Sequence, residues 1–271
     1  MRIARFSIPG ADPAYGIVEL AEDGGQYPDT VSVISNDPLV GPVKYTGARH
    51  DLSAVRLLAP VIPRSKIIAM ARNYAEHAHE MGSDAPINPM VFMKPNTSVV
   101  GPDDPIIKPG ECQVLSYEGE LAVVIGRICR RVPPEQAEKV IFGYTCANDV
   151  TARDLQSVDG QWARAKGFDT FCPLGPWIVA HMGIAEADDR RITTTLDGKV
   201  VQDDTTASMV HHVAEIVAYA SSFATLLPGD VLLTGTPAGI GPMEVGQRVS
   251  VSIEGIGVLT NPVIADGSEH E

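Results

Sequence analysis

Two glutamates, Glu118 and Glu120, lie two residues apart in an otherwise apolar stretch, VLSYEGELAVVI, at residues 114–125. This composition predicts a buried strand, and alternate side chains of a strand project from the same face. Each carboxylate then raises the electrostatic cost of burying the other. A hard divalent cation would offset that cost, because it prefers oxygen ligands held close together on a rigid element. An edge strand with its polar face in water is the alternative, because E-x-E is a common string.

A third carboxylate, that of Asp149, follows the predicted strand IFGYTCANDV. A loop directly after a strand end is a favourable place for a third cation ligand. TARDLQ predicts a helix with Thr151 as candidate N-cap. If the helix begins at or just after Asp149, Arg153 and Gln156 follow Asp149 at i+4 and i+7 and share its face. The alternative to a cation ligand is that Asp149 is an acidic residue favoured by a helix N-terminus, with Arg153 as its solvated partner. That interpretation gives Gln156 no role.

A histidine and a glutamate, His77 and Glu80, lie three residues apart in the helix-like stretch NYAEHAHEM. On a helix they face the same way. A carboxylate beside an imidazole orients the ring and stabilises its protonated form, as in a general-base dyad. A surface ion pair is the alternative, and it is the commoner case for an isolated H-x-x-E.

Two further stretches have the composition of ordered loops. GQWARAKGFDTFCPLGPW, at residues 160–177, carries Lys166 and Thr170 among glycines and aromatic residues. TGTPAGIG, at residues 234–241, follows a predicted strand and includes Thr236. Its small residues would let backbone N–H groups approach an anion. Neither stretch is a P-loop and no G-x-G-x-x-G follows a strand, so nucleotide binding is not indicated.

The elements that must position these residues fall into two regions. Residues 1–60 contain short strands with little room for a core, which predicts a small N-terminal β-rich domain. Residues 61–271 alternate strands with a few helices and form the predicted main domain. Its clearest helix is SMVHHVAEIVAYASSFATLL, where apolar residues recur at spacings of three and four. We expect His211 and His212 to lie inside that helix.

Composition excludes several classes of partner. The chain has 271 residues, of which 44% are hydrophobic and 20% charged, as in soluble globular proteins. A formal net charge of -13 repels phosphate groups, so we expect neither nucleic acid nor membrane as a partner. No apolar segment approaches the length of about 18 residues that suggests a membrane span, and MRIARFSIPG lacks the apolar core of a signal peptide. A cytoplasmic protein is expected.

The chain resembles the fumarylacetoacetate hydrolase family in six stretches that occur in this order: ARNYAEHAHEM, VFMKP, YEGELAVVIG, ANDVTARDLQ, QWARAKGFDTFCPLGPW and GDVLLTGTPAGIG. The ordered combination is specific, although each piece alone is weak. It looks closest to smaller bacterial members, in the acylpyruvase and oxaloacetate decarboxylase branch, whose relatives are labelled 2-hydroxyhepta-2,4-diene-1,7-dioate isomerase. The resemblance implies an α+β, β-rich fold: a mixed β-roll or sandwich of the family's C-terminal domain type, assembled as a homodimer.

The resemblance also implies roles for the carboxylates and the histidine. Glu118, Glu120 and Asp149 match the family's ligands for a divalent cation, which we expect to be Mg²⁺, with Mn²⁺ as the other choice. Such a cation would neutralise the glutamate pair. His77 and Glu80 match the family's catalytic dyad, which lies on a short mobile lid segment.

The remaining assignments concern the loops. Lys166 matches the family's catalytic lysine near the metal, with Thr170 close to it, where we expect Thr170 to contact the substrate. Arg153, Gln156 and Thr236 match positions that contact the substrate. We therefore expect all five of these side chains to border one site.

Together these residues predict a metal-dependent enzyme that acts on small 2-oxo acids through an enolate. We expect C–C bond hydrolysis of acylpyruvates or decarboxylation of oxaloacetate. Isomerisation of a 2-hydroxyhepta-2,4-diene-1,7-dioate-type substrate, in aromatic catabolism, is the alternative, because one enolate serves all three reactions. A catalytically inactive binding protein on the same fold is the non-enzymatic alternative. A glycosidase acid pair ranks low, because such carboxylates flank a cleft about 5 to 9.5 Å wide and do not share one strand face.

Overall fold

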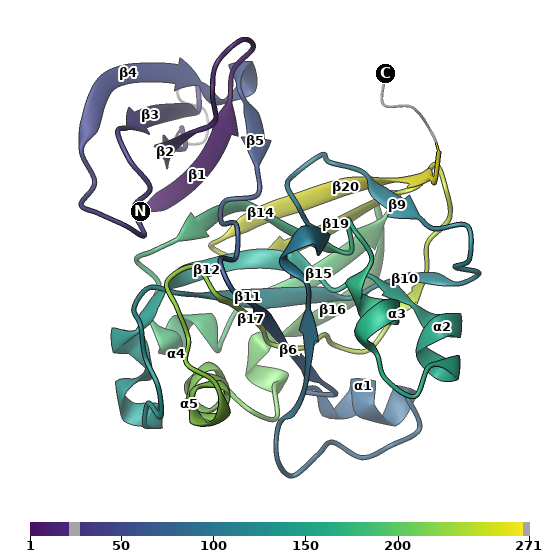
Figure 1. Cartoon of the computed structure of the whole chain (residues 1–271). Helices are drawn as coiled ribbons and strands as arrows, with labels where there is room; N and C mark the ends of the chain where they lie inside the picture. Colours follow the sequence, from purple (N-terminus) through teal and green to yellow (C-terminus); the bar gives the residue numbers. More distant parts are fainter. Residues whose placement is uncertain (22–27, 268–271) are drawn as a thin grey trace.

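The computed structural model describes residues 1–21 and 28–267 (Figure 1). Its helices are α1 Ala75–Glu80, α2 Arg153–Val158, α3 Ala163–Gly167, α4 Ile184–Ala187 and α5 Val213–Phe223. Its strands are β1 Arg2–Ser7, β2 Ala14–Glu19, β3 Thr30–Ile34, β4 Tyr45–Asp51, β5 Arg56–Leu58, β6 Ile67–Ala71, β7 Met90–Lys94, β8 Val99–Val100, β9 Ile106–Lys108, β10 Leu115–Tyr117, β11 Gly119–Ile125, β12 Ile141–Asn148, β13 Thr151–Ala152, β14 Cys172–Val179, β15 Arg191–Leu196, β16 Lys199–Thr205, β17 Val231–Leu233, β18 Gly241–Pro242, β19 Arg248–Ile253 and β20 Gly257–Ala265. The expected β-rich α+β class is confirmed.

The largest sheet in the described part of the chain has the strand order β4, β3, β2, β1, β14, β12, β11, β17, β6, β7. The N-terminal strands join it through β1, which pairs antiparallel with β14, Arg2 opposite Val179. The strands expected in residues 1–60 are therefore present, and they extend the sheet of the main part. The division of the chain at residue 60 stays a prediction.

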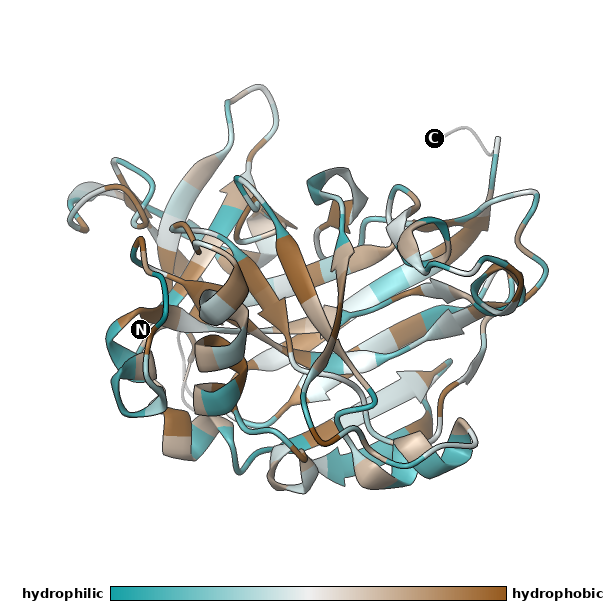
Figure 2. Ribbon diagram, turned by 60° about the horizontal axis from the view of Figure 1, so that its bottom comes forward, coloured by the Kyte–Doolittle hydropathy of each residue, from teal (hydrophilic) through white to brown (hydrophobic). Residues whose placement is uncertain are grey.

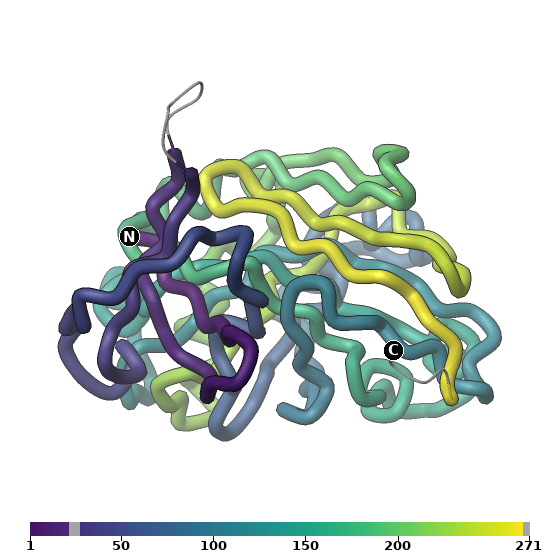
Figure 3. The backbone as a smooth tube through the Cα atoms, turned by 90° about the horizontal axis from the view of Figure 1, so that it is seen from above, coloured from purple at the N-terminus to yellow at the C-terminus, as the bar shows by residue number. Residues whose placement is uncertain are grey.

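Two smaller sheets in the same described ranges complete the architecture. One, which we call the second sheet, has the order β16, β15, β19, β20, β9, and the other has the order β13, β10, β18. Figures 1 and 3 show the N-terminal strands (purple) and β20 (yellow) on the side of the molecule away from α1. Strands β11 and β12 are neighbours in the interior of the largest sheet, and β10 and β13 pair with each other in the smallest one.

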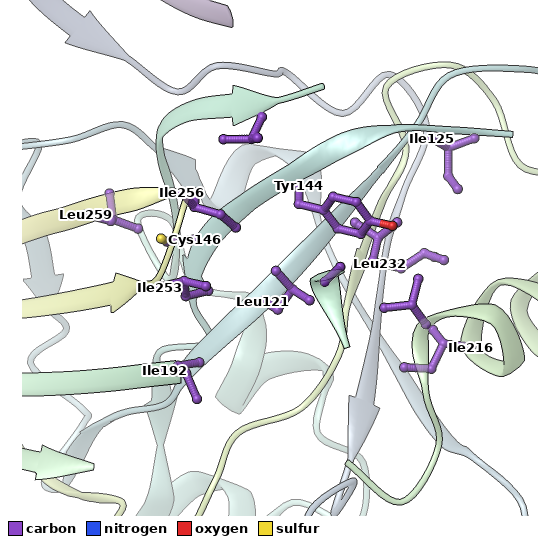
Figure 4. Packing of buried hydrophobic residues seen from close by; sticks show 14 of the residues in the cluster. Leu121, Ile125, Tyr144, Cys146, Ile192, Ile216, Leu232, Ile253, Ile256 and Leu259 are labelled. Atoms are coloured by element: carbon purple, nitrogen blue, oxygen red, sulfur yellow. The ribbon is translucent and has the colours of Figure 1, made fainter. Parts of the chain in front are cut away.

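Strand β11 is buried on both faces, as its composition predicts. Leu121 and Val123 belong to a core between the main sheet, the second sheet and α5, whereas Ala122 and Val124 belong to a core on the opposite face. Figure 4 shows Leu121 of the first core among labelled side chains of the second sheet, and Figure 2 shows apolar residues concentrated in the central strands. A strand clamped between two cores holds its N-terminal end, where the glutamates lie, in a fixed position.

Two predicted helix boundaries are wrong. Helix α5 begins at Val213, so His211 and His212 precede it, and His212 is its N-cap residue. The backbone before α5 is bonded elsewhere: the N–H of His211 donates to Asn73 Oδ1 at 2.8 Å, and that of Val210 to the Asn73 carbonyl at 2.8 Å. Because these hydrogen bonds to Asn73 hold residues 210 and 211 in a non-helical conformation, the helix begins only after them.

The second wrong boundary is that of α2. Thr151 is not its N-cap: it pairs with Ser116 in the β10–β13 ladder, and Ala152 is the N-cap residue. Asp149 therefore precedes the helix and does not share a helical face with Arg153. Its prediction as a loop carboxylate directly after a strand is correct, because β12 ends at Asn148.

No helix within the described ranges is long and apolar enough to cross a membrane. The homodimer implied by the family resemblance stays a prediction, which sedimentation velocity would measure.

Candidate metal centre and active site

Three carboxylates meet where β11 begins and β12 ends. Gly119 lies opposite Asn148 in the antiparallel ladder, which brings Glu118 and Glu120 beside Asp149. One oxygen from each carboxylate lies within 4.8 Å of the other two, and all three side chains are buried. The Asp149 N–H donates to the Glu118 carbonyl at 2.9 Å, which fixes the two backbones together.

The glycine between the two glutamates is required by packing. A Cβ at Gly119 would lie 2.2 Å from Thr194 Oγ1 of the second sheet, closer than any real contact. The chain can therefore pass between the sheets only with glycine at this point. Glu118 itself interrupts the predicted strand, since β10 ends at Tyr117 and β11 begins at Gly119.

Cationic side chains contact two of the three carboxylates. Lys166 Nζ lies 2.9 Å from Glu118 Oε2 and 2.6 Å from Asp149 Oδ2. Arg153 pairs with Glu118 on its other oxygen. Among the described residues Glu120 has no such partner, and its carboxylate accepts one hydrogen bond, from the Gly235 N–H at 2.6 Å.

A fourth group, Lys94, was not predicted from the sequence. It ends β7, is 2% exposed, and places Nζ 2.5 Å from Asp149 Oδ1. A buried lysine costs free energy unless it is paired. The signal for it is a lysine that closes an apolar strand in VFMKP and is followed by proline.

Electrostatics distinguish the two glutamates. Burial opposes ionisation of Glu118, but the charges of Lys166 and Arg153 outweigh it and hold its pKa well below the ordinary value. Burial, together with the charges of Asp149 and Glu118, raises the pKa of Glu120 well above its ordinary value. Glu120 is thus the carboxylate whose charge is least compensated. A divalent cation within reach of all three oxygens would compensate it, so this oxygen-only donor set fits Mg²⁺ or Mn²⁺.

Millimolar Mg²⁺ or Mn²⁺ should raise the melting temperature, because a ligand that binds only the folded state stabilises it. Cation at 100 times its Kd adds about 2.7 kcal/mol, or about 5 to 10 °C for a chain of this size. Glu120→Gln should abolish the shift, whereas the exposed Glu135→Gln should retain it. Scanning calorimetry measures both, and wild-type protein with neither a shift nor a heat of binding would contradict the metal centre.

The His77–Glu80 pair joins a buried histidine to an exposed glutamate. His77 lies on α1 and is 5% exposed, and its Nδ1 is 3.3 Å from Glu80 Oε2. Glu80 also accepts hydrogen bonds from the Gly239 N–H, at 3.2 and 3.3 Å to its two oxygens. Gly239 has φ +96°, and a Cβ there would lie 2.3 Å from the Val201 carbonyl oxygen, so only glycine fits. Glu80 thus connects α1 to the TGTPAGIG loop.

Glu118 of the triad and His77 of the histidine–glutamate pair border one cavity. It encloses about 330 Å³ of empty space, part of which is open to solvent, and its lining is Met70, Ala71, Arg72, His77, Met81, Phe92, Glu118, Arg153, Gln156, Trp162, Lys166 and Thr236. The structure therefore brings five predicted side chains together with the triad: His77, Lys166, Arg153, Gln156 and Thr236. The aromatic wall of Phe92 and Trp162, whose ring centroids are 5.6 Å apart, was not predicted.

Thr170 is the predicted residue that the structure does not bring to this cavity. Its Oγ1 accepts a hydrogen bond from the Ile107 N–H at 2.9 Å, and it borders a different surface hollow, beside Arg56. The expectation that Thr170 contacts the substrate was based on its distance from Lys166 in the sequence. Three residues lie between them, and α3 ends within that interval, so the chain carries Thr170 away from the cavity.

Hydrogen bonds hold the substrate-facing side chains in place. Arg153 donates to Gln156 Oε1 at 3.0 Å, which fixes the two relative to each other on α2. Gln202 was missed by sequence reasoning and anchors the TGTPAGIG loop. Its Nε2 donates to Thr236 Oγ1 at 2.8 Å, and its Oε1 accepts from the Gly119 N–H at 3.1 Å. The Thr236 hydroxyl thus retains its own proton for donation into the cavity.

Sequence comparisons place this geometry among known proteins. Residues 66–264 match the family described as fumarylacetoacetate (FAA) hydrolase C-terminal, and residues 1–60 match one described as Rv2993c-like, N-terminal. Protein Rv2993c of Mycobacterium tuberculosis is 47% identical, over 98% of this chain and 99% of the relative. The mitochondrial oxaloacetate tautomerase Fahd2a of Rattus norvegicus is 36% identical, over 97% of this chain and 92% of the relative.

Solved structures agree with these relatives. The crystal structure of 2-hydroxyhepta-2,4-diene-1,7-dioate isomerase from Mycobacterium marinum matches with a TM-score of 0.89 at 45% identity, over 99% of this chain and 100% of that one. Fumarylpyruvate hydrolase from Pseudomonas aeruginosa, solved in complex with Mn²⁺ and pyruvate, matches with a TM-score of 0.71 at 33% identity, over 76% and 91% of the two chains. This chain therefore belongs to the fumarylacetoacetate hydrolase family, a family of enzymes.

Proposed function

We propose that the protein is a divalent-cation-dependent enzyme that enolises small 2-oxo acids, in the course of C–C bond hydrolysis of acylpyruvates or decarboxylation of oxaloacetate. One observation carries the proposal: a buried carboxylate triad adjoins, through Glu118, the cavity that His77 and Lys166 line. Glu118, Glu120 and Asp149 would hold Mg²⁺ or Mn²⁺. When bound, the cation supplies a Lewis acid for negative charge that develops on the keto oxygen of the substrate.

His77 would be the residue that accepts a proton from the substrate or from water. Its Nδ1 faces Glu80, which leaves Nε2 for the cavity that the residue lines. The Glu80 carboxylate stabilises the imidazolium that forms when the ring accepts a proton. A proton taken from carbon 3 produces the enolate, whereas a proton taken from water produces the nucleophile that attacks an acyl carbonyl. Because His77 is almost fully buried, both transfers are sheltered from bulk solvent.

Lys166, Arg153 and Gln156 would bind and orient the 2-oxo acid. The Lys166 ammonium has three donors, of which two are used by Glu118 and Asp149, so one remains for a substrate oxygen. Because two buried hydrogen bonds already hold the Lys166 ammonium, it needs to move little when negative charge develops on the substrate oxygen. The Thr236 hydroxyl adds a second donor from the opposite loop.

Proton transfer alone is the second candidate function. It is favoured by the names of two relatives, an oxaloacetate tautomerase from rat and a dienedioate isomerase from M. marinum. Tautomerisation or isomerisation requires an acid–base residue above the carbon atom and no activated water, and His77 would serve both. An inactive binding protein is disfavoured, because the triad, His77, Glu80 and Lys166 are all present.

A turnover screen tests the proposal. Acetylpyruvate, fumarylpyruvate, oxaloacetate and 2-hydroxyhepta-2,4-diene-1,7-dioate would each be incubated with the protein in Mn²⁺, Mg²⁺ or EDTA. Cleavage of an acylpyruvate or release of CO₂ should be at least about 10²-fold faster with cation, as expected when several kcal/mol of charge stabilisation are removed. Keto–enol exchange without C–C cleavage would favour the second candidate. Equal rates in cation and EDTA on every substrate would overturn both.

A further inference from the structure

Arg72 lines the cavity and has no role in the scheme above. It follows β6 directly and borders the same space as His77 and Lys166. Its φ is +57°, a left-handed conformation that costs a residue other than glycine free energy and that occurs often at functional sites. Glycine or asparagine would adopt this conformation more easily. The backbone alone therefore does not account for an arginine at this position.

The Arg72 guanidinium is unpaired within the described part of the chain, where it makes no hydrogen bond and no ion pair. The other two cations that line the cavity are both engaged: Arg153 with Glu118, and Lys166 with Glu118 and Asp149. A guanidinium has five N–H donors and stays protonated at any physiological pH. Arg72 therefore offers both charge and unused donors to whatever occupies the cavity.

The charges around the triad balance without Arg72. The site holds three carboxylates and three cationic side chains, those of Lys94, Lys166 and Arg153, which pair with Glu118 and Asp149. A divalent cation together with Arg72 would then leave three positive charges without a partner. A 2-oxo acid with one carboxylate cancels one of them. A 2-oxo acid with a second carboxylate cancels two and gives the guanidinium a bidentate partner.

We propose that Arg72 binds the distal carboxylate of the substrate, so that the enzyme prefers 2-oxo dicarboxylic acids to monocarboxylic ones. The inference rests on the proposed function, because it takes the 2-oxo acid end of the ligand to lie over the triad. The Phe92 and Trp162 rings line the cavity and provide apolar surface for the carbon chain of such a ligand.

Ligand binding tests the assignment without turnover. 2-Oxoglutarate and 2-oxopentanoate differ only in a terminal carboxylate in place of a methyl group. Titration calorimetry with Mn²⁺-loaded wild-type protein should show about 10- to 100-fold tighter binding of the dicarboxylate, as expected for hydrogen bonds to a charged group. Arg72→Met should bring the two Kd values together by weakening the dicarboxylate only. Arg72→Lys should give an intermediate ratio, because lysine keeps the charge and loses the bidentate geometry.

Two further variants serve as a substitute for Arg72→Met and as a control. Arg72→Asn is neutral and tolerates the left-handed backbone, so it replaces Arg72→Met if that variant fails to fold. Arg49→Met removes an exposed arginine on β4, outside the cavity lining, and should keep the wild-type ratio. Wild-type protein without a preference for the dicarboxylate, or a preference that survives in both neutral Arg72 variants, overturns the assignment.

A second matched pair separates this inference from the proposed function. Fumarylpyruvate and crotonylpyruvate also differ by a carboxylate in place of a methyl group, and Arg72→Met should lower kcat/KM for fumarylpyruvate alone, mainly through KM. Cation-dependent turnover with no change in this ratio would remove the role of Arg72 and leave the function in place. A binding preference that depends on Arg72, without turnover of any 2-oxo acid, would remove the function and leave the role of Arg72.

Discussion

Replacing His77 with alanine should lower kcat for an acylpyruvate by about 10²- to 10⁴-fold, the range for a lost general base, and leave cation affinity almost unchanged. The two effects separate because His77 lies on α1, whereas the proposed cation ligands lie where β11 begins and β12 ends. Steady-state kinetics measures the first effect and calorimetric titration with Mn²⁺ the second. Decarboxylation of oxaloacetate should suffer less than hydrolysis, because it needs no activated water.

The same helix provides the control. His79 lies two residues from His77 but is exposed, so His79→Ala should retain nearly full activity. Glu80→Ala should lower kcat less than His77→Ala, because it orients the ring and does not carry the proton. The double variant His77→Ala/Glu80→Ala should be little worse than His77→Ala, since the two residues act as a unit. Full activity of His77→Ala on every substrate would refute the dyad, and an equal loss of Mn²⁺ binding would make His77 part of the metal centre.

Local periodicity was sufficient to predict the parts of the site that lie on one short segment. Glu118 and Glu120 share a face because they are two residues apart, and this holds although the strand is interrupted at Glu118. His77 and Glu80 meet because residues three apart are neighbours on a helix. Asp149 was placed by its position after a strand end, and the β11–β12 register then brings it to the glutamates.

Contacts between distant segments could not be predicted in this way. Lys94 meets Asp149 across 55 residues of sequence, and its neighbours in VFMKP do not indicate which carboxylate it reaches. The start of α5 is set by the backbone and side chain of Asn73, which take up the N–H groups before the helix. The prediction for Thr170 failed for a related reason. Thr170 is close to Lys166 in the sequence, but α3 ends between them, and the chain then carries Thr170 to a different neighbour, Ile107.

Lys94→Met should lower the free energy of unfolding in EDTA by about 3 to 5 kcal/mol, the cost of removing one partner from a buried ion pair. The side chains of Lys94 and Asp149 are both fully enclosed, so no water replaces the lost ammonium. A divalent cation at the triad would supply part of the missing charge. The stabilisation by millimolar Mn²⁺ should therefore be larger in Lys94→Met than in wild-type protein, as measured by urea denaturation with Mn²⁺ or EDTA.

A second buried pair, remote from the triad, supplies the matched control. Lys66 Nζ lies 2.6 Å from Asp230 Oδ2, and the Asp230 side chain is fully buried. Lys66→Met should also destabilise the protein, because it too strands a carboxylate. The Mn²⁺ stabilisation of Lys66→Met should nevertheless equal that of wild-type protein, since Asp230 is not one of the three carboxylates proposed to hold the cation. If Mn²⁺ stabilises both variants by the same increment, Lys94 does not compensate the charge of the metal centre. If only Lys94→Met shows the larger increment, the buried lysine and the cation share the task of neutralising Asp149.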